Sequence, residues 1–280
     1  MPFGVGSTER LVETIRDLRV TAISCTPSYP AVIEQVIEER FDFQPRDLGL
    51  ELALFGGEAG LDDTAFRARL EEMWGFAARN ANYGISDVLC NIAGQCEHEN
   101  DLHFFALDVL YPELIDPRSG DPQPWEDGAA GELVLTHLAK ECQPLVRFRT
   151  GDLVRITATE PCVCGRTTPR FRVIGRSDDA VVVRGISVFP TMVAAVVNEF
   201  ESLSGEYRIE LSGPGPYDAL PLVVELRGNA EVGAGLASAV SQAVKRHLGV
   251  SARVGVVAPR ALPRTAGKTR RVVYTDVAAR

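Results

Sequence analysis

The sequence predicts a layered α/β domain with a small β region, followed by an α+β domain of the ferredoxin-like kind. Three observations lead to this expectation. Strand and helix patterns alternate through the N-terminal part, which is typical of an α/β domain. Strands joined by turns follow from residue 103 to residue 152. After Gly175 the pattern becomes β-α-β-β-α-β, the order of a ferredoxin-like domain.

The N-terminal elements follow from apolar spacing and turn residues. Residues 8–18 (TERLVETIRDL) carry three apolar residues at helical spacing, and Thr8 is the expected cap. The segment TAISCTPSYP predicts a short buried strand that ends at a proline turn, and a helix is expected over 31–40. LGLELALFGGEAG predicts a strand and a glycine turn, and DDTAFRARLEEMWG the next helix.

The later elements change in character. HFFALDVLYPELID, GELVLTH and PLVRFRTGDLV predict strands of a mainly antiparallel region. Beyond it, DAVVVRGISVFP predicts a strand and turn, TMVAAVVNEFE a helix, YRIELSG and ALPLVVELRG two strands, AGLASAVSQAVKRHLG a helix and ARVGVVAP a strand. We place the boundary near 176–179, which gives expected domains of 1–176 and 177–280.

Composition excludes several classes of function. The net charge of −9 disfavours a nucleic-acid partner, because phosphates are bound by clustered lysine and arginine. No apolar run approaches the roughly 20 residues of a membrane span, so no membrane partner is expected. Six cysteines are too few for a disulfide scaffold, and the N-terminus does not read as a secretory signal. We therefore expect a cytoplasmic protein.

Two glycine-containing segments follow predicted strands. In FGGEAG (55–60) the glycines would let the backbone approach a flat ring or a phosphate, although an ordinary strand-to-helix turn has the same pattern. In NYGISD (82–87) Tyr83 could stack on a purine, Ser86 could donate to a phosphate and Asp87 could bind Mg²⁺. The alternative is a tyrosine packed beside a tight turn.

Two further segments end in residues suited to nucleotide chemistry. RFRTGD (147–152) is expected to end a strand with Asp152 in a turn, where a carboxylate can accept both hydroxyls of a ribose or can only cap the turn. PRTAGKTRR (263–271) carries Lys268, one of only three lysines. A lysine on such a loop can stabilise developing negative charge, and the alternative is a solvated surface charge.

The cysteines are distributed unevenly. Cys162 and Cys164 lie in EPCVCGRTTP, and a C-x-C pair followed by glycine is suited to presenting two thiolates to one metal. Cys96 in QCEHENDLHF could be a third ligand, with His98 or His103 the fourth. Such a set predicts a structural zinc site, and the alternative is metal-free thiols.

The other cysteines and histidines carry no comparable pattern. Cys25, Cys90 and Cys142 lie in apolar or strand contexts and are expected to be small core residues. His137 and His247 have no evident partner in the sequence.

In this order the segments resemble the adenylate-forming superfamily of acyl-CoA ligases, adenylation domains and luciferases, and more narrowly the phenylacetate-CoA ligases. The motifs that carry the resemblance are TPSY (26–29), FGGEAG, YGISD, YPELIDPRSGDP, RFRTGD, GRSDDAVVVRGISVFP and LPRTAGKTRR. The resemblance covers essentially the whole chain. It implies that 1–176 is the C-terminal part of a large AMP-binding domain and that 177–280 is the small mobile domain.

The resemblance also implies roles at matching positions of the large domain. The residues implied to line the adenine and acyl side of the pocket or to hold the nucleotide are Gly57, Glu58, Ala59, Tyr83, Gly84 and Ser86. Asp87 stands where the family usually has a glutamate associated with Mg²⁺. Asp152 would bind the ribose, and Arg176 would contact ribose or phosphate. Some relatives carry a similar cysteine–histidine arrangement, which favours His103 over His98 as a zinc ligand.

In the small domain three residues match family positions. Asp178 would be the hinge between two half-reactions, Gly185 would lie near the tunnel for the thiol, and Lys268 would bridge carboxylate and α-phosphate during adenylation. The resemblance therefore implies an AMP-forming acid:CoA ligase that uses ATP, Mg²⁺ and coenzyme A on an aryl or acyl carboxylic acid.

One family element has no counterpart here. Relatives carry an earlier Ser/Thr/Gly-rich loop that embraces the β- and γ-phosphates of ATP, and no segment of this sequence resembles it. We expect the ligase to act as it stands, or completed by a separate N-terminal half or a homodimer. The alternative is a non-catalytic adenylate-binding or partner-binding module derived from such a ligase.

Overall fold

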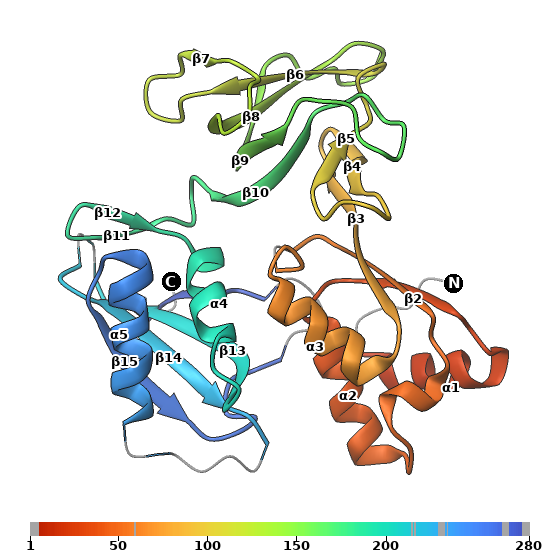
Figure 1. The fold of residues 1–280 in the computed structure, drawn as a ribbon, viewed down its shortest axis with the longest axis vertical. Coiled ribbons are helices and arrows are strands. Elements are labelled where there is room, and N and C mark those ends of the chain that lie inside the picture. Colours follow the sequence, from red (N-terminus) through yellow and green to blue (C-terminus); the bar gives the residue numbers. More distant parts are fainter. Residues whose placement is uncertain are drawn as a thin grey trace. The chain divides into compact units, whose positions relative to one another are not determined.

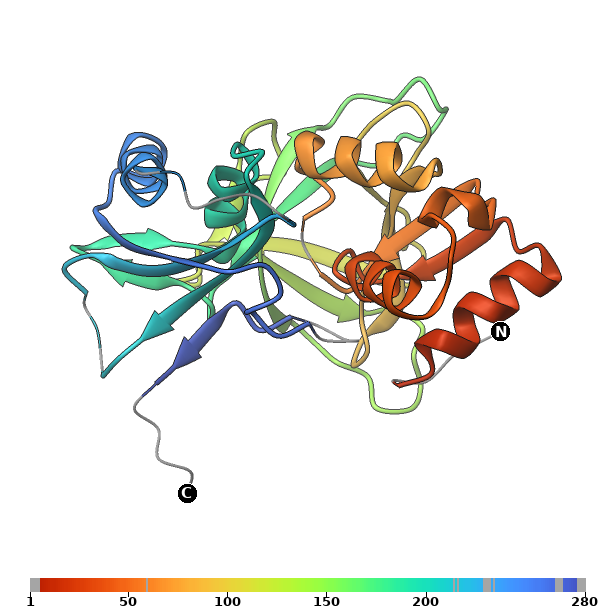
Figure 2. The same cartoon turned by 90° about the horizontal axis from the view of Figure 1, so that it is seen from below.

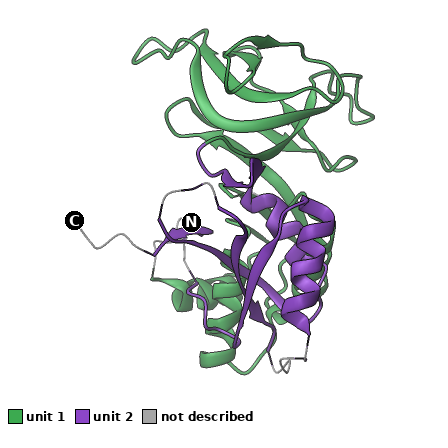
Figure 3. Cartoon of the chain, turned by 90° about the vertical axis from the view of Figure 1, so that its left-hand side faces the viewer, with its two compact units in different colours: residues 1–177, 265–268 green, residues 178–264, 269–280 purple. Residues whose placement is uncertain are grey.

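A computed structural model describes the chain in several stretches. They are residues 6–58, 60–213, 215, 217–228, 233, 235–264 and 269–275. The chain divides into two compact units, unit 1 with residues 1–177 and 265–268 and unit 2 with residues 178–264 and 269–280 (Figure 3). Within the described stretches, no helix combines the length and the apolar character needed to cross a membrane.

Unit 1 begins with the predicted alternation of helices and strands. Its first elements are α1 (Thr8–Leu18), β1 (Ala22–Cys25), α2 (Tyr29–Arg40), the 3₁₀ helix η1 (Pro45–Leu48), β2 (Leu52–Gly56), α3 (Thr64–Trp74) and β3 (Ala77–Ile85). Strands β1, β2 and β3 pair in parallel. Parallel neighbours need a crossover connection, and the helices between these strands supply it. The predicted α/β class is confirmed for this part.

The ends of two helices show how local sequence sets their bounds. Helix α1 begins after Ser7 rather than after Thr8, so the predicted Thr8 cap is wrong. The Thr8 hydroxyl instead forms a hydrogen bond with the Tyr29 hydroxyl at 2.9 Å, because Thr8 already lies on the buried face of the helix. Helix α3 has a true side-chain cap, since Asp63 accepts hydrogen bonds from the backbone N–H groups of Ala65 and Phe66.

The rest of unit 1 is antiparallel and continues the same sheet. Its strands are β4 (Leu89–Gln95), β5 (Leu102–Phe104), β6 (Leu110–Ile115), β7 (Pro122–Gln123), β8 (Ala130–His137), β9 (Phe148–Ala158) and β10 (Arg170–Arg176). The ten strands run in the order β1-β2-β3-β4-β5-β10-β9-β8-β6-β7. Strand β3 joins the two halves, because its first residues pair with β2 and its last residues pair with β4 (Figure 1).

Each half of unit 1 has its own apolar core. The helical half packs around Phe55 and Trp74, whose side chains are fully buried together with the inner face of α1 and α2. The antiparallel half packs around Phe104 and Phe171, whose ring centroids lie 6.5 Å apart. Residues near β3, β9 and β10 therefore lie on a rigid support.

Unit 2 is an α+β domain, as predicted, with one difference in topology. Its elements are β11 (Val181–Val183), β12 (Ile186–Val188), α4 (Pro190–Asn198), β13 (Leu203–Leu211), β14 (Leu220–Leu226), α5 (Leu236–Leu248), β15 (Ala252–Val257) and β16 (Val272–Tyr274). The sheet order is β15-β14-β13-β16, with α4 and α5 on one face (Figure 2). The first predicted strand of this domain forms a separate hairpin, β11–β12, and β16 takes the edge beside β13.

Candidate functional site

A buried carboxylate lies where β9 meets β10. Asp152 pairs across the ladder with Arg176, so both residues lie within strands, and the expected position of Asp152 in a turn is wrong. Its Oδ1 accepts a hydrogen bond from Nη1 of Arg176 at 2.7 Å, and its Oδ2 accepts one from the Tyr83 hydroxyl at 2.8 Å. Asp152 is 8% exposed, whereas the Arg176 side chain is 43% exposed. The arginine therefore compensates the buried charge and still reaches solvent.

The backbone around Asp152 is fixed by two residues that the sequence reasoning missed. The Thr150 hydroxyl donates to the carbonyl of Leu133 at 2.8 Å and accepts from the N–H of Asp152 at 3.0 Å. Glu132, only 2% exposed, accepts from Arg149 and from the N–H of Gly151 at 3.2 Å. Glu132 could have been recognised from the sequence, because it is an acid inside the apolar strand GELVL and a buried charge needs dedicated partners.

The backbone conformation at position 151 favours glycine, and a side chain there would also have to displace the end of Arg176. Gly151 has a φ of 75°, which is unfavourable for residues with a side chain. A Cβ there would also lie 2.9 Å from Nη2 of Arg176. The guanidinium of Arg176 thus lies close to the backbone of Gly151.

Tyr83 connects this carboxylate to the other glycine-containing segment. Burial, followed by the charge of Asp152 and the hydrogen bond to it, raises the pKa of Tyr83 well above its usual value. The ring meets Phe171 edge-on at 5.5 Å. The neighbouring Gly84 lies so close to β4 that a Cβ would be 2.1 Å from the carbonyl oxygen of Cys90. Tyr83 is therefore a neutral donor in a rigid hairpin.

The FGGEAG segment follows β2, as expected. Gly57 lies in the turn after this strand, and Oε2 of Glu58 accepts from the N–H of Ser28 at 3.3 Å. Burial and the nearby Glu58 charge raise the pKa of Cys25 to about 12, so that thiol is unreactive near neutral pH. Ala59 lies outside the described residues.

Several predicted site residues are not brought to the Asp152 carboxylate by any hydrogen bond described here. Ser86 and Asp87 are exposed in the turn after β3, where Nζ of Lys140 donates to the Asp87 carbonyl at 3.1 Å. Asp178 is exposed and is the first residue of unit 2. Gly185 lies in the β11–β12 turn with a φ of 83°.

Lys268 lies outside the described residues, but the chain on both sides of 265–268 is held by ion pairs within unit 2. On one side Nη2 of Arg264 contacts Oε1 of Glu225 on β14 at 2.5 Å. On the other side Nη1 of Arg271 contacts Oε2 of Glu206 on β13 at 2.5 Å. Two adjacent strands, β14 and β13, thus hold the chain on either side of residues 265–268.

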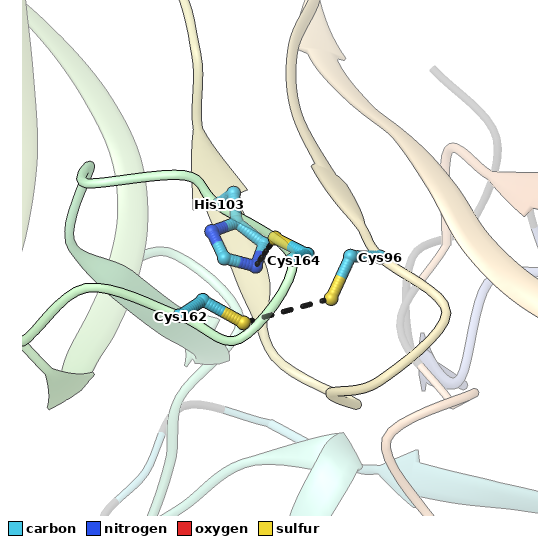
Figure 4. Close-up of side chains that lie close together, drawn as sticks. All are labelled: Cys96, His103, Cys162 and Cys164. Atoms are coloured by element: carbon cyan, nitrogen blue, oxygen red, sulfur yellow. Dashed lines mark hydrogen bonds between the residues drawn. The ribbon is translucent and has the colours of Figure 1, made fainter.

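A second cluster gathers three cysteines and one histidine of unit 1 (Figure 4). Cys96 follows β4, His103 lies on β5, and Cys162 and Cys164 come from the loop between β9 and β10. Strand β5 pairs with both β4 and β10, and this pairing brings the distant segments together. The four ligand atoms lie within 4.8 Å of one another, with the Cys96 and Cys162 Sγ atoms 3.9 Å apart and the Cys164 Sγ 3.8 Å from Nε2 of His103.

The electrostatics of this cluster favour metal ligation. His103 is completely buried, and burial together with the charges of Arg166 and Arg170 lowers its pKa, so the imidazole is neutral at pH 7. The backbone N–H of Arg166 is the main cause that lowers the pKa of Cys164 to about 7. His98 lies elsewhere, half-exposed and 3.3 Å from Glu97. The geometry thus brings His103, not His98, to the cysteines.

The remaining cysteines depart from the expectation that they lie in the core. Cys25 is half-buried, but Cys90 and Cys142 are exposed, so the prediction is wrong for both. Cys90 lies on the exposed first part of β4, and Cys142 lies in the loop before β9.

His137 and His247 have partners that the sequence did not reveal. Nδ1 of His137 accepts from the N–H of Leu145 at 2.9 Å, and its Nε2 lies 3.1 Å from the carbonyl of Val88. His247 lies 3.2 Å from Glu199.

Comparisons with known proteins show what the chain as a whole is similar to. Residues 185–275 match the family described as the AMP-binding enzyme C-terminal domain. The chain is 35% identical to a phenylacetate-coenzyme A ligase of Aromatoleum evansii over 98% of its own length and 62% of that protein. It is 34% identical to a phenylacetate-coenzyme A ligase of Thermus thermophilus, covering 98% of this chain and 64% of the relative.

Solved structures give the same result. A 2-hydroxyisobutyryl-CoA ligase in the postadenylation state, in complex with R3-HIB-AMP, matches 98% of this chain with a TM-score of 0.87 and 31% identity. The match covers 59% of that structure. This chain thus spans about three fifths of the length of the relatives that it matches.

Proposed function

We propose that this chain belongs to the phenylacetate-CoA ligase-like branch of the adenylate-forming superfamily and supplies the adenylate-binding and thioester-forming parts of an AMP-forming acid:CoA ligase; its similarity to phenylacetate-coenzyme A ligases supports this. In the first half-reaction a carboxylate oxygen attacks the α-phosphorus of ATP, and the bond to pyrophosphate breaks. In the second, the sulfur of coenzyme A attacks the acyl carbon, its proton leaves, and AMP departs with the C–O electron pair. The substrate is an aryl or acyl carboxylic acid.

One observation carries this proposal: the grouping of Tyr83, Asp152 and Arg176. A buried carboxylate that is paired with an arginine can accept two ribose hydroxyls. The guanidinium of Arg176 is half-exposed and can contact a phosphate through N–H groups other than the one that donates to Asp152. The Tyr83 hydroxyl orients the carboxylate, and the ring offers an edge to the adenine side.

The other positions complete the pocket in this proposal. The residues assigned to the adenine, acyl and phosphate contacts are Gly57, Glu58, Ala59, Gly84 and Ser86. Asp87 would hold Mg²⁺, since an exposed carboxylate in a turn can offer oxygen to a hydrated cation. Gly185 would line the path of the thiol, because its turn leaves the backbone open. Magnesium would neutralise charge on the phosphates.

Lys268 is the catalytic residue that we assign to the adenylation half-reaction. Its ammonium group would stabilise the charge that develops between the carboxylate and the α-phosphate. The ion pairs of Arg264 and Arg271 support this assignment, because they fix the chain on either side of the lysine. Asp178 begins unit 2 and is assigned as the hinge, and we propose domains of 1–176 and 177–280.

We also propose that Cys96, His103, Cys162 and Cys164 hold a structural zinc ion. The donor set fits the metal, because three sulfurs and one imidazole nitrogen are the ligands of closed tetrahedral sites. The ion would link the β4–β5 connection to the loop between β9 and β10. Such thiolates persist in a reducing compartment, which favours the cytoplasm.

ATP–pyrophosphate exchange across a panel of aromatic and aliphatic acids tests the proposal. We expect exchange from the chain by itself, as a homodimer, or together with a separately encoded N-terminal half. Lys268→Ala should reduce exchange about 100-fold or more while Lys245→Ala, on the exposed end of α5, leaves it unchanged. Absence of exchange under every condition would favour a non-catalytic module that binds adenylate or a partner.

A further inference from the structure

One buried arginine of unit 1 takes no part in the site described above. Arg67 lies on α3 and is only 8% exposed. Its Nη2 donates to the carbonyl oxygen of Leu61 at 2.9 Å and to Oε1 of Gln95 at 3.1 Å, and its Nη1 donates to Oδ1 of Asn100. Because a guanidinium cannot lose its proton in a protein, this buried charge must keep its acceptors.

Two of the three acceptors belong to two different functional segments, and the third, Gln95, is the last residue of β4. Leu61 lies in the glycine segment, which we define as residues 56–58 and 60–62. Gln95 directly precedes Cys96, and Asn100 lies in the metal loop, residues 96–103, which begins and ends with two of the four clustered ligands. A single side chain therefore contacts the glycine segment and both sides of Cys96.

Further contacts make this junction stiff. Oε1 of Gln95 also accepts from the N–H of Asn80 on β3 at 2.8 Å, and its Nε2 donates to Asn100 at 3.2 Å. Asp101, in the metal loop, is buried and pairs with Arg172 of β10. A displacement of the metal loop would remove acceptors from Arg67, and a buried donor that loses its acceptor is costly.

We propose that Arg67 is a positioning residue that couples occupancy of the cysteine–histidine cluster to the order of the glycine segment. This inference rests on the proposed zinc site. When zinc holds the metal loop in place, Asn100 and Gln95 stay beside Arg67, and Arg67 in turn holds the carbonyl of Leu61. When the metal loop loosens, the same guanidinium releases the glycine segment, which is assigned to the substrate pocket.

Hydrogen exchange of the full chain, read by mass spectrometry on peptides from both segments, tests the coupling. Zinc is titrated into chelator-treated protein, with the metal alone as the probe. In the wild-type chain we expect zinc to slow exchange about 10-fold in the metal loop and also in the glycine segment. In Arg67→Met zinc should still slow exchange in the metal loop but not in the glycine segment.

Two further variants keep the test informative if the Arg67→Met protein does not fold. Asn100→Ala removes an exposed acceptor on the metal-loop side and should weaken the coupling without unfolding the chain. Arg79→Met, whose arginine contacts Ala78 and Glu71 instead, should leave the coupling unchanged.

The outcomes separate the coupling from the zinc proposal. Protection of the metal loop alone in the wild-type chain contradicts the coupling and leaves the zinc proposal intact. Protection of neither segment contradicts both. Unaltered coupling in Arg67→Met and Asn100→Ala would also overturn the inference.

Discussion

The buried polar groups of the two units differ in how their partners are supplied. In unit 2, Glu225 is 1% exposed and accepts hydrogen bonds from Ser204, Leu262 and Arg264, all from its own unit. In unit 1 the cysteine–histidine cluster gathers four ligand atoms within 4.8 Å, and within the described residues Nδ1 of its His103 has no hydrogen-bond partner. Unit 2 satisfies its buried charge internally, whereas this part of unit 1 gathers side chains that we propose to hold a metal ion.

This difference has a functional meaning. Self-sufficient ion pairs are suited to holding the ends of a segment, as Arg264 and Arg271 do on either side of 265–268. Converging sulfur and nitrogen ligand atoms are suited to a permanent cation. The Asp152 group is intermediate, because its acid is compensated but its arginine remains half-exposed and able to exchange partners. Ligand removal should therefore affect unit 1 and spare unit 2.

The largest expected effect is loss of the cation from unit 1. Chelation of zinc, or Cys162→Ser, should lower the melting temperature of unit 1 by about 10 °C, because the binding energy of a structural metal is folding energy. Calorimetry and metal analysis measure the effect. Cys142→Ser, at an exposed cysteine outside the cluster, is the matched control. Identical unfolding with and without chelator would contradict this side of the comparison.

Unit 2 should respond to the loss of one of its own charges and not to chelation. Glu225→Gln should destabilise unit 2 by about 3–5 kcal/mol, because Arg264 would remain buried without its counter-ion. Glu210→Gln, in a looser pair with Arg208 at 3.7 Å, should change stability by less than about 1 kcal/mol. Chemical denaturation followed by hydrogen exchange distinguishes the two units. Equal effects of the two variants would break the comparison.

Glu225 should also make the stability of unit 2 depend on pH in the acid range. Burial opposes ionisation of Glu225, but the hydrogen bonds from Arg264 and Leu262 outweigh it and lower the pKa below its usual 4.5. A lowered folded pKa means that the stabilisation is present above pH 4.5 and is lost as pH falls further. Glu225→Gln should flatten this acid limb for unit 2. An unchanged slope in the variant would assign the acid sensitivity to other groups.

The smallest expected effect concerns Tyr83. Tyr83→Phe should cost about 0.5–1.5 kcal/mol, because Asp152 loses one donor and keeps Arg176. The raised pKa of Tyr83 means that the unfolded chain ionises first, so wild-type stability should fall as pH rises past about 10. The variant should lose less stability in this range. Denaturation curves at several alkaline pH values measure the difference.

The sequence predicted the elements that carry a local pattern. Alternation of strands and helices identified the parallel part of unit 1, and the spacing of EPCVCGRTTP identified two members of the cysteine–histidine cluster. These features depend on neighbours in the chain, so they are visible without the fold. The first strand of the small domain also had the correct local pattern, but whether it joins a sheet or pairs with β12 depends on distant edges.

The remaining features depend on contacts that sequence spacing does not reveal. Arg67 has the spacing of the buried face of α3, together with Leu70 and Trp74, but its charge conceals this in the sequence. Only the folded chain brings Leu61, Gln95 and Asn100 around its guanidinium. Asp152 lies within β9 because this strand pairs with β10 at Asp152 and with β8 on both sides of it. Cys90 is exposed because the first three residues of β4 are all exposed, whichever face of the strand they lie on, and this depends on what the folded chain packs against that end of the strand.

The central claim is that the chain binds an adenylate through the Asp152 carboxylate. Titration calorimetry of AMP into the full chain tests it directly, and it needs neither ATP nor the acyl substrate. We expect saturable binding by the wild-type protein and binding at least about 10-fold weaker by Asp152→Asn, since a charge-assisted bond to the ribose is lost. Asp121→Asn, at an exposed position of the same unit, should match the wild type. Equal AMP affinity in wild type and Asp152→Asn, or no binding to either, would contradict the account.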